Sequence, residues 1–248
     1  MKIKGYWLFF FIICAGVISL GWGLAPGKNS AEINFPSELK FSGVSWDGEN
    51  FWVLNYQSAP LKCRILKLGA DGTVIKAIEA PGKCVREDIH NFGVRNITFD
   101  GENFWISHWN EGKIYQISPT GEILTSFTIS EVGTLLPTGL TWDGRYLWVL
   151  HWSNKTIYQV DTSGNVIKKI SVRRIKPPLD SGLAWDGEYL WVGSERWNKI
   201  GQINLNGNLI KVLDGPRETA GIQDLDWNGE RLLVVYRHNH SIYTVNVK

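Results

Sequence analysis

The chain has 248 residues, of which 44% are hydrophobic and 20% charged, and its formal net charge is +2. Leaving out Lys2 and Lys4, which precede a long apolar segment, 24 basic residues face 24 acidic ones. A near-neutral chain without charge runs lacks the basic footprint of a nucleic-acid-binding protein, so this partner class is excluded.

The N-terminus has the pattern of an export segment. Two lysines lie within Met1–Lys4, and Tyr6–Leu24 then contains 19 residues without a charge. Residues 1–25 are therefore either a secretory signal peptide or an N-terminal membrane anchor that spans with residues 6–24. With the lysines retained inside, both alternatives predict an exported protein that is secreted, periplasmic or anchored to the outer side of the cytoplasmic membrane.

Residues 26–41 precede the first repeat and contain an alternating apolar pattern. Ala31, Ile33 and Phe35 alternate with polar residues, which is typical of a single β-strand.

A twelve-residue motif then occurs five times, beginning near residues 42, 95, 138, 181 and 223. In each copy two apolar runs flank an Asp-Gly or Asn-Gly pair, which indicates a tight β-hairpin. The aligned aromatic residues are spaced 53, 43, 43 and 42 residues apart: Trp46, Phe99, Trp142, Trp185 and Trp227.

A second hairpin follows the first in each repeat. Its turn glycine lies seven residues after the isoleucine that opens the strand, as in Ile114 to Gly121 and Ile157 to Gly164. Each repeat therefore has four antiparallel strands, which we name a, b, c and d from the axis outward. A period in the low forties with four short strands predicts a β-propeller.

The last repeat lacks its fourth strand. Ile242–Val247 forms strand c, and the sequence stops where the next turn glycine would come. Pairing this strand with residues 31–35 would remove two open sheet edges. The predicted fold is thus all-β: a five-bladed propeller over residues 26–248, closed by an N-terminal strand that completes the last blade.

Blade one has two insertions, one between strands b and c and one after strand d. Cys63 and Cys84 lie in these two expected loops, on the same face of the ring. Two cysteines placed to meet in an exported domain predict a disulfide.

Most chemistry-bearing residues map to one face. The a–b and c–d turns are short and repetitive, whereas the b–c and d–a connections vary; we call these two ends the turn face and the loop face. Variable loops on a rigid scaffold are the usual place of a binding site. The candidates on the loop face are Asn55, Tyr56, His90, His108, Trp109, His151, Trp152, Glu195, Arg196, Trp197, Tyr236, Arg237, His238 and His240. Two alternatives remain open: a polar and aromatic bowl for a ligand, or side chains that cap strand ends beneath the loops.

Two acidic residues lie on strand a of blade five, where the other blades carry mostly small residues. Asp224 and Asp226, together with Asn96, are candidate ligands of a divalent cation such as Ca²⁺ or Mg²⁺. They are equally suited to bonding backbone groups and holding the closing blade in register, because buried acids need partners.

The segment Leu190–Ile203, followed by Asn206–Ile210, resembles the blade repeat of NHL, YVTN and virginiamycin B lyase-like propellers. The lyase resemblance implies a metal-dependent enzyme, but its site motif has no counterpart here, so no catalytic residue carries over. Plant-type glutaminyl cyclases are similar in being secreted five-bladed propellers.

These features predict an exported module that binds a small molecule, glycan or protein through its loop face. The alternative is a propeller enzyme, either a metal-dependent lyase or lactonase or a glutaminyl cyclase. A bound divalent metal would favour the enzyme.

Overall fold

The computed structural model describes residues 29–58, 61–84, 93–132, 134–219, 221–237 and 241–247. The predicted export segment, residues 1–25, lies outside them. Within the described ranges, no helix has the length and hydrophobicity needed to cross a membrane. The one helical element there is a single 3₁₀ turn, η1 (Ser130–Val132).

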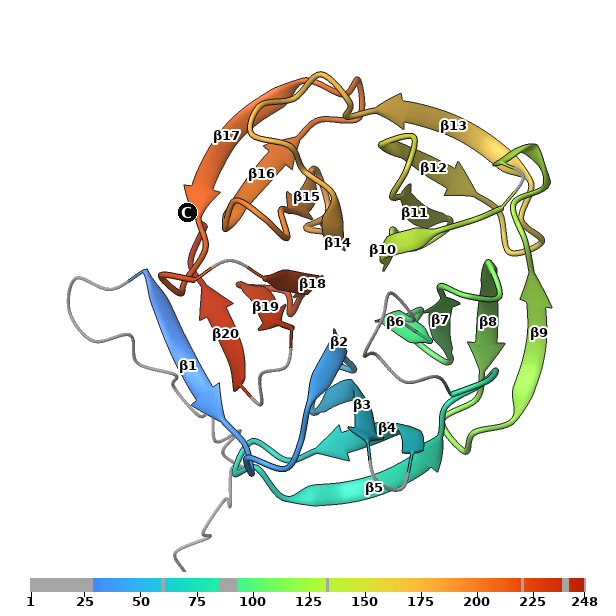
Figure 1. The fold of residues 1–248 in the computed structure, drawn as a ribbon, viewed down its shortest axis with the longest axis vertical. Helices are drawn as coiled ribbons and strands as arrows, with labels where there is room; N and C mark the ends of the chain where they lie inside the picture. Colours follow the sequence, from blue (N-terminus) through green and yellow to red (C-terminus); the bar gives the residue numbers. More distant parts are fainter. Residues whose placement is uncertain are drawn as a thin grey trace, which may run out of the picture.

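Five four-stranded antiparallel sheets are arranged around a central axis (Figure 1), which confirms the predicted five-bladed propeller. The innermost strands carry the start of each repeat, and the outermost strands run around the circumference. The strands are β2 (Phe41–Trp46), β3 (Phe51–Ser58), β4 (Leu61–Leu68) and β5 (Val74–Glu79) in blade one; β6 (Val94–Phe99), β7 (Phe104–His108), β8 (Lys113–Ile117) and β9 (Ile123–Phe127) in blade two; β10 (Pro137–Trp142), β11 (Leu147–His151), β12 (Thr156–Val160) and β13 (Val166–Ser171) in blade three; β14 (Ser181–Trp185), β15 (Leu190–Gly193), β16 (Lys199–Ile203) and β17 (Leu209–Asp214) in blade four; and β18 (Ile222–Trp227), β19 (Leu232–Tyr236), β20 (Ser241–Val245) and β1 (Ser30–Asn34) in blade five.

The a–b turns owe their shape to a repeated contact that we call the Asp–Trp clasp. In blade three, Asp143 Oδ1 accepts the backbone N–H groups of Arg145 and Tyr146, while Oδ2 accepts Trp148 Nε1 at 2.7 Å. Gly144 follows the aspartate with φ of 95°, a conformation that favours glycine. The same clasp joins Asp47 to Trp52, Asp100 to Trp105 and Asp186 to Trp191.

Blade five keeps the backbone half of the clasp and lacks the indole half. Asn228 Oδ1 still accepts the two backbone N–H groups of the turn, but Leu233 stands where the other blades have the indole. Since a buried indole N–H requires an acceptor, the four blades that carry the tryptophan also carry the aspartate, and the blade with leucine carries asparagine.

The core lies between neighbouring blades. Trp105, Trp148 and Trp191 are the largest fully buried side chains, and each packs between sheets with its nitrogen turned to the clasp. Trp142 and Trp185 of the other aromatic column are only partly buried and cover the edges of the same clusters.

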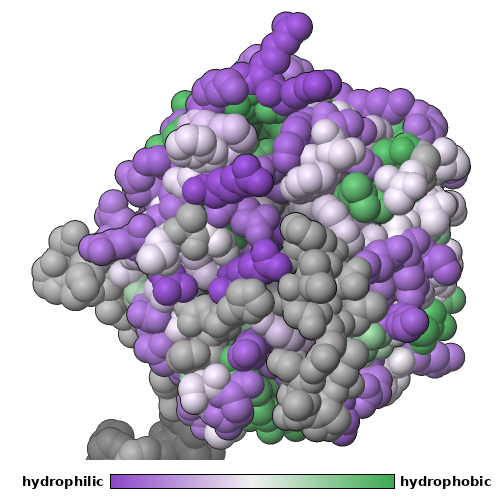
Figure 2. Space-filling view, in the orientation of Figure 1, coloured by the Kyte–Doolittle hydropathy of each residue, from purple (hydrophilic) through white to green (hydrophobic). Residues whose placement is uncertain are grey.

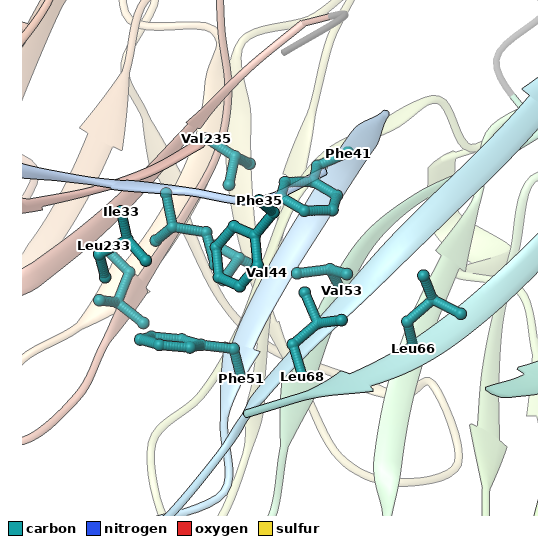
Figure 3. Packing of buried hydrophobic residues seen from close by; sticks show 11 residues of the cluster. Ile33, Phe35, Phe41, Val44, Phe51, Val53, Leu66, Leu68, Leu233 and Val235 are labelled. Carbon is teal, nitrogen blue, oxygen red and sulfur yellow. The ribbon is translucent and has the colours of Figure 1, made fainter. Parts of the chain in front are cut away.

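The N-terminal strand closes the ring, as predicted. β1 pairs antiparallel with β20, from Ser30 opposite Val245 to Asn34 opposite Ser241. Figure 3 shows Ile33 and Phe35 packed between Leu233 and Val235 of blade five and the apolar residues of blade one. The closing strand therefore joins the sheet of the last blade and also seals that blade against the first.

Blade one differs from the prediction in one respect. The b–c insertion extends the strands, because β3 and β4 stay paired as far as Ser58 opposite Leu61, so Cys63 belongs to a strand and not to a loop. The predicted disulfide is confirmed: Cys63 is bonded to Cys84, with their Cα atoms 5.5 Å apart. The bond ties the segment that leaves β5 to the lengthened hairpin.

Candidate functional site

The innermost strands of neighbouring blades approach one another closely. A Cβ atom on Gly139 would lie 2.8 Å from Leu183 Cβ, and one on Gly182 would lie 2.9–3.0 Å from the backbone at Asp224 and Leu225. Gly182 also has a positive φ of 64°. Glycine is required at these two positions because any side chain would force the blades apart.

A hydrogen-bonded group spans the axis at this level. Asn96 Nδ2, from blade two, donates to Asp224 Oδ1 of blade five at 2.9 Å, and Asn96 Oδ1 accepts from Ser107 Oγ at 3.0 Å. Asp224 Oδ2 also accepts Val44 N at 3.3 Å. Asn96 and Asp224 therefore connect blades two and five across the axis, near its loop-face end.

Asp224 and Asp226 both face blade one. Asp226 Oδ2 accepts Trp46 N at 2.8 Å, so the two carboxylates dock the last blade onto the backbone of the first. Burial raises the pKa of Asp226 to about 7 and raises the pKa of Asp224 well above its usual range, because desolvation disfavours the charged form more than the hydrogen bonds favour it.

The hydrogen bonds of Asp224 and Asp226 to the backbone of blade one fit the structural alternative that the sequence left open, in which these carboxylates hold the closing blade in register. Among the described residues, no group of three His, Cys, Asp or Glu side chains is placed to hold a metal ion. Asn96 turns its nitrogen, not its oxygen, toward Asp224, so a cation would require that amide to turn over. Binding of Ca²⁺ or Mg²⁺ by Asp224, Asp226 and Asn96 therefore stays a prediction.

The candidates at the end of strand b fall into two groups, since successive side chains of a strand point to opposite sides. The first group is buried and bonds the d–a connections to the blades, which corresponds to the capping alternative. Its bonds run from Asn55 Nδ2 to Lys40 O (3.2 Å), from His108 Nε2 to Lys83 O (2.9 Å), from His151 Nε2 to Thr134 O (3.1 Å) and from Arg217 N to Tyr236 Oη (3.3 Å).

The second group lies one residue further along and includes the more accessible side chains: Tyr56, Trp109, Trp152, Glu195 and Arg237. Trp109 and Trp152 meet edge to face with their rings 5.8 Å apart, and Trp152 is 41% exposed. Lys155 Nζ lies 5.1 Å from the centre of the Trp152 ring and 3.2 Å from Asp180 Oδ2. Aromatic and charged side chains therefore share this end of the ring.

Arg95 is a central residue that the sequence did not mark as a candidate. It occupies a β-bulge at the start of β6, where the register shifts between Val94 and Asn96. Its Nη2 atom reaches across from blade two to Glu195 Oε2 of blade four at 3.5 Å, and its guanidinium lies 5.2 Å from the Trp109 ring centre. The available signal was that Arg95 is the one charged residue in its repeat column, whose other members are Ser42, Thr138, Ser181 and Gln223.

Glu195 joins two arginines. Its Oε1 atom accepts from Arg237 Nη1 of blade five at 3.3 Å, while Oε2 faces Arg95. Its backbone N–H donates to Asp180 Oδ1 at 3.1 Å, which fixes the start of the turn after β15. We call Arg95, Glu195 and Arg237 the mouth cluster, because together they link blades two, four and five at the loop-face end of the axis.

The remaining candidates lie further out or outside the described residues. Arg196 is exposed, and Trp197 is 58% exposed. His90, His238 and His240 are outside the described residues. Figure 2 shows the molecule in the orientation of Figure 1: hydrophilic side chains cover much of the visible surface, and hydrophobic ones form small scattered patches.

No protein-family model matches the sequence, and no match was found among curated proteins. Solved structures share the fold. A glutaminyl cyclase from Myxococcus xanthus is similar with a TM-score of 0.68 and 11% identity, over 87% of this chain and 94% of that one. A virginiamycin B lyase from Staphylococcus aureus has a TM-score of 0.54 and 15% identity, over 88% and 99%. A chain of a nidogen/laminin complex has a TM-score of 0.53 and 16% identity, over 80% and 72%.

These similarities confirm the repeat-level resemblance to virginiamycin B lyase-like propellers. At such identities they show the fold alone, because one propeller scaffold supports many unrelated functions.

Proposed function

We propose that this protein is an exported binding module, which holds a small molecule, a glycan or a protein partner at the loop-face end of its axis. The observation that carries the proposal is the mouth cluster beside Trp109 and Trp152. It draws charged residues from three blades to one point, whereas the turn face repeats the same Asp–Trp clasp. The Cys63–Cys84 disulfide supports export, since such bonds persist in oxidising compartments.

The proposal is tested by screening the purified protein against metabolites, oligosaccharides and extracellular proteins, with binding detected by ligand-observed NMR or biolayer interferometry. We expect a hit that loses at least tenfold in affinity in Trp152→Ala and in Glu195→Gln. Ile167→Ala, at an exposed apolar residue of the outer strand β13, is the matched control and should bind normally. A ligand that binds both mouth variants as tightly as the unmodified protein would contradict the proposal.

A propeller enzyme remains the alternative, and the glutaminyl cyclase structure, similar over nearly its whole length, is the observation that favours it. The same protein would be incubated with a peptide that begins with glutamine, and separately with a streptogramin or a lactone, with and without EDTA. If the protein turns over one of these substrates and Glu195→Gln abolishes the turnover, the proposed function changes from a binding module to an enzyme that acts at the same site. Turnover that EDTA abolishes would also support a divalent metal at Asp224, Asp226 and Asn96.

A further inference from the structure

Exposed basic residues gather on the loop face between blades three and four. The connection that runs from the outer strand β13 to the innermost strand β14 (Figure 1), residues 172–180, contains three of them and one acidic residue, Asp180. The corresponding connection between blades two and three, residues 128–136, contains no lysine or arginine. A fourth exposed basic residue lies in the turn after β15. We call these four residues the basic patch: Arg173, Arg174, Lys176 and Arg196.

The connection that carries most of the basic patch is fixed at both ends. Val172 and Leu179 are each 1% exposed and pack in the core between blades three and four. Val172 N donates to Lys155 O at 2.8 Å, in the b–c turn of blade three. Asp180 accepts Lys155 Nζ at 3.2 Å and, from the b–c turn of blade four, Glu195 N at 3.1 Å. The basic side chains therefore extend from a segment whose position is set by two blades.

The charges of the basic patch are not used inside the protein. Within the part of the chain that the structure describes, none of its four side chains forms an ion pair or a hydrogen bond. The acidic residues nearby have other partners, since Asp180 pairs with Lys155 and Asp214 pairs with Lys199. Four exposed cations without acidic partners attract an anionic molecule to this part of the loop face.

Two exposed tryptophans accompany these cations. Trp152 is 41% exposed in the b–c turn of blade three, and Trp197, which follows Arg196, is 58% exposed in the b–c turn of blade four. Tryptophan and arginine are enriched among the residues that dominate protein–protein binding energies, and three of the four basic residues are arginines. Insertion into a membrane would require apolar side chains, but Val172 and Leu179 of the connection are buried. The composition of this surface therefore favours a protein as the anionic partner.

We propose that the basic patch docks an acidic segment of a protein partner, in which aspartate or glutamate side chains flank an apolar one. This inference rests on the proposed function and extends its site outward from the mouth cluster over blades three and four. The carboxylates pair with the guanidiniums of Arg173, Arg174 and Arg196, whose planar forks can bond both oxygens of a carboxylate. The apolar side chain packs on the exposed ring of Trp197.

The test measures binding of fluorescently labelled peptides to the purified protein by fluorescence anisotropy. The probes are a peptide of three Glu-Glu-Leu repeats, an all-glutamate peptide of the same length and a peptide of three Lys-Lys-Leu repeats. We expect the Glu-Glu-Leu peptide to bind, the all-glutamate peptide to bind at least fivefold more weakly because it lacks the apolar contact, and the Lys-Lys-Leu peptide not to bind. Raising the salt concentration to about 0.15 M should weaken binding, because exposed charges are screened.

Two patch variants and a matched control locate the interaction. Arg173→Gln combined with Arg174→Gln should weaken binding of the Glu-Glu-Leu peptide at least tenfold. Trp197→Ala should weaken it at least fivefold and leave binding of the all-glutamate peptide unchanged. The control combines Arg145→Gln with Lys168→Gln, which removes two charges from exposed positions of blade three outside the patch, and it should bind normally. Because all these side chains are exposed, each variant should keep the melting temperature of the unmodified protein.

No binding of the Glu-Glu-Leu peptide, or equal losses in the patch variants and the control, would overturn the inference. Heparin and vesicles containing phosphatidylglycerol are measured alongside, and binding of either one without the peptide would also overturn it, in favour of a polysaccharide or a membrane. Each of these results leaves the proposed function standing if the separate screen finds a ligand that Trp152→Ala and Glu195→Gln weaken. A screen whose hits bind these two variants normally would contradict the proposed function itself.

Discussion

The turn face and the loop face are built from the two ends of the same strands, yet their side chains follow opposite rules. On β11, Trp148 points its indole to Asp143 in a clasp that four blades repeat. Four residues later, Trp152 is partly exposed beside Trp109, its counterpart in blade two, and the counterparts in the other three blades are a tyrosine, a glutamate and an arginine. Positions that repeat in the blades therefore hold residues that stabilise each blade. Positions that vary between blades hold residues that the fold of a blade does not require.

The largest test of this comparison uses the two tryptophans of blade three. Trp148→Ala should lower the free energy of unfolding by about 3–5 kcal/mol, because it empties a fully buried site between blades. Trp152→Ala should change it by less than about 0.5 kcal/mol, as is usual for exposed side chains. Urea denaturation followed by circular dichroism measures both. Equal losses would show that the loop face is as structural as the turn face.

The second test concerns the axis, where the last blade docks onto the first. The pKa of Asp226 is about 7 in the folded protein and near 3.8 in an unfolded chain, so the folded state binds the extra proton between these values. Stability from this group is therefore fully present at low pH and is lost as the pH rises through about 7. Between pH 5 and pH 8 we expect the free energy of unfolding to fall by about 2–3 kcal/mol from this group alone.

The control for the pH test is Asp226→Asn, which keeps an oxygen acceptor for Trp46 N and removes the titration. Its unfolding free energy should depend less on pH than that of the unmodified protein, with the remaining slope in the same direction because burial also raises the pKa of Asp224. Denaturation at several pH values measures both slopes. Identical slopes would mean that the carboxylate is already ionised at pH 5.

The smallest expected effect comes from the clasp itself. Asp143→Asn exchanges a carboxylate oxygen for an amide nitrogen that competes with the Trp148 indole as a donor, so it should cost about 1–3 kcal/mol. The reverse change in blade five, Asn228→Asp, should alter stability by less than about 0.5 kcal/mol, because Leu233 offers no indole. Thermal unfolding of the two variants measures the difference. Similar costs would show that the clasp acts through the backbone turn alone.

The sequence alone predicted the blade number, the four strands of each blade, the closing strand and the disulfide partners. All of these depend on local chemistry that repeats: a turn glycine, an apolar alternation, a cysteine in each of two inserted segments. One repeated contact was not predicted. Asp143 was interpreted only as a residue of the tight turn, and its hydrogen bond from the Trp148 indole became visible only in the structure.

The candidate site was predicted less completely. The loop face as the place of a binding site stays a prediction, and its neighbouring columns could not be separated in the sequence, so His108 and His151 were grouped with Trp109 and Trp152. The structure separates them: the histidines bond the d–a connections, and the tryptophans lie beside the mouth cluster. Alternation along a strand assigns two sides to a blade, but which side faces the axis depends on the packing of five blades.

Sequence therefore determined what each blade is, because hairpins and strands follow from residues close together in the chain. Only the tertiary structure decided what meets at the axis. Arg95 and Glu195 are separated by 100 residues and belong to blades that are not neighbours in the ring, and a β-bulge gives Arg95 its direction. Contacts of this kind arise from ring closure, which brings distant strand ends together, and no local pattern records them.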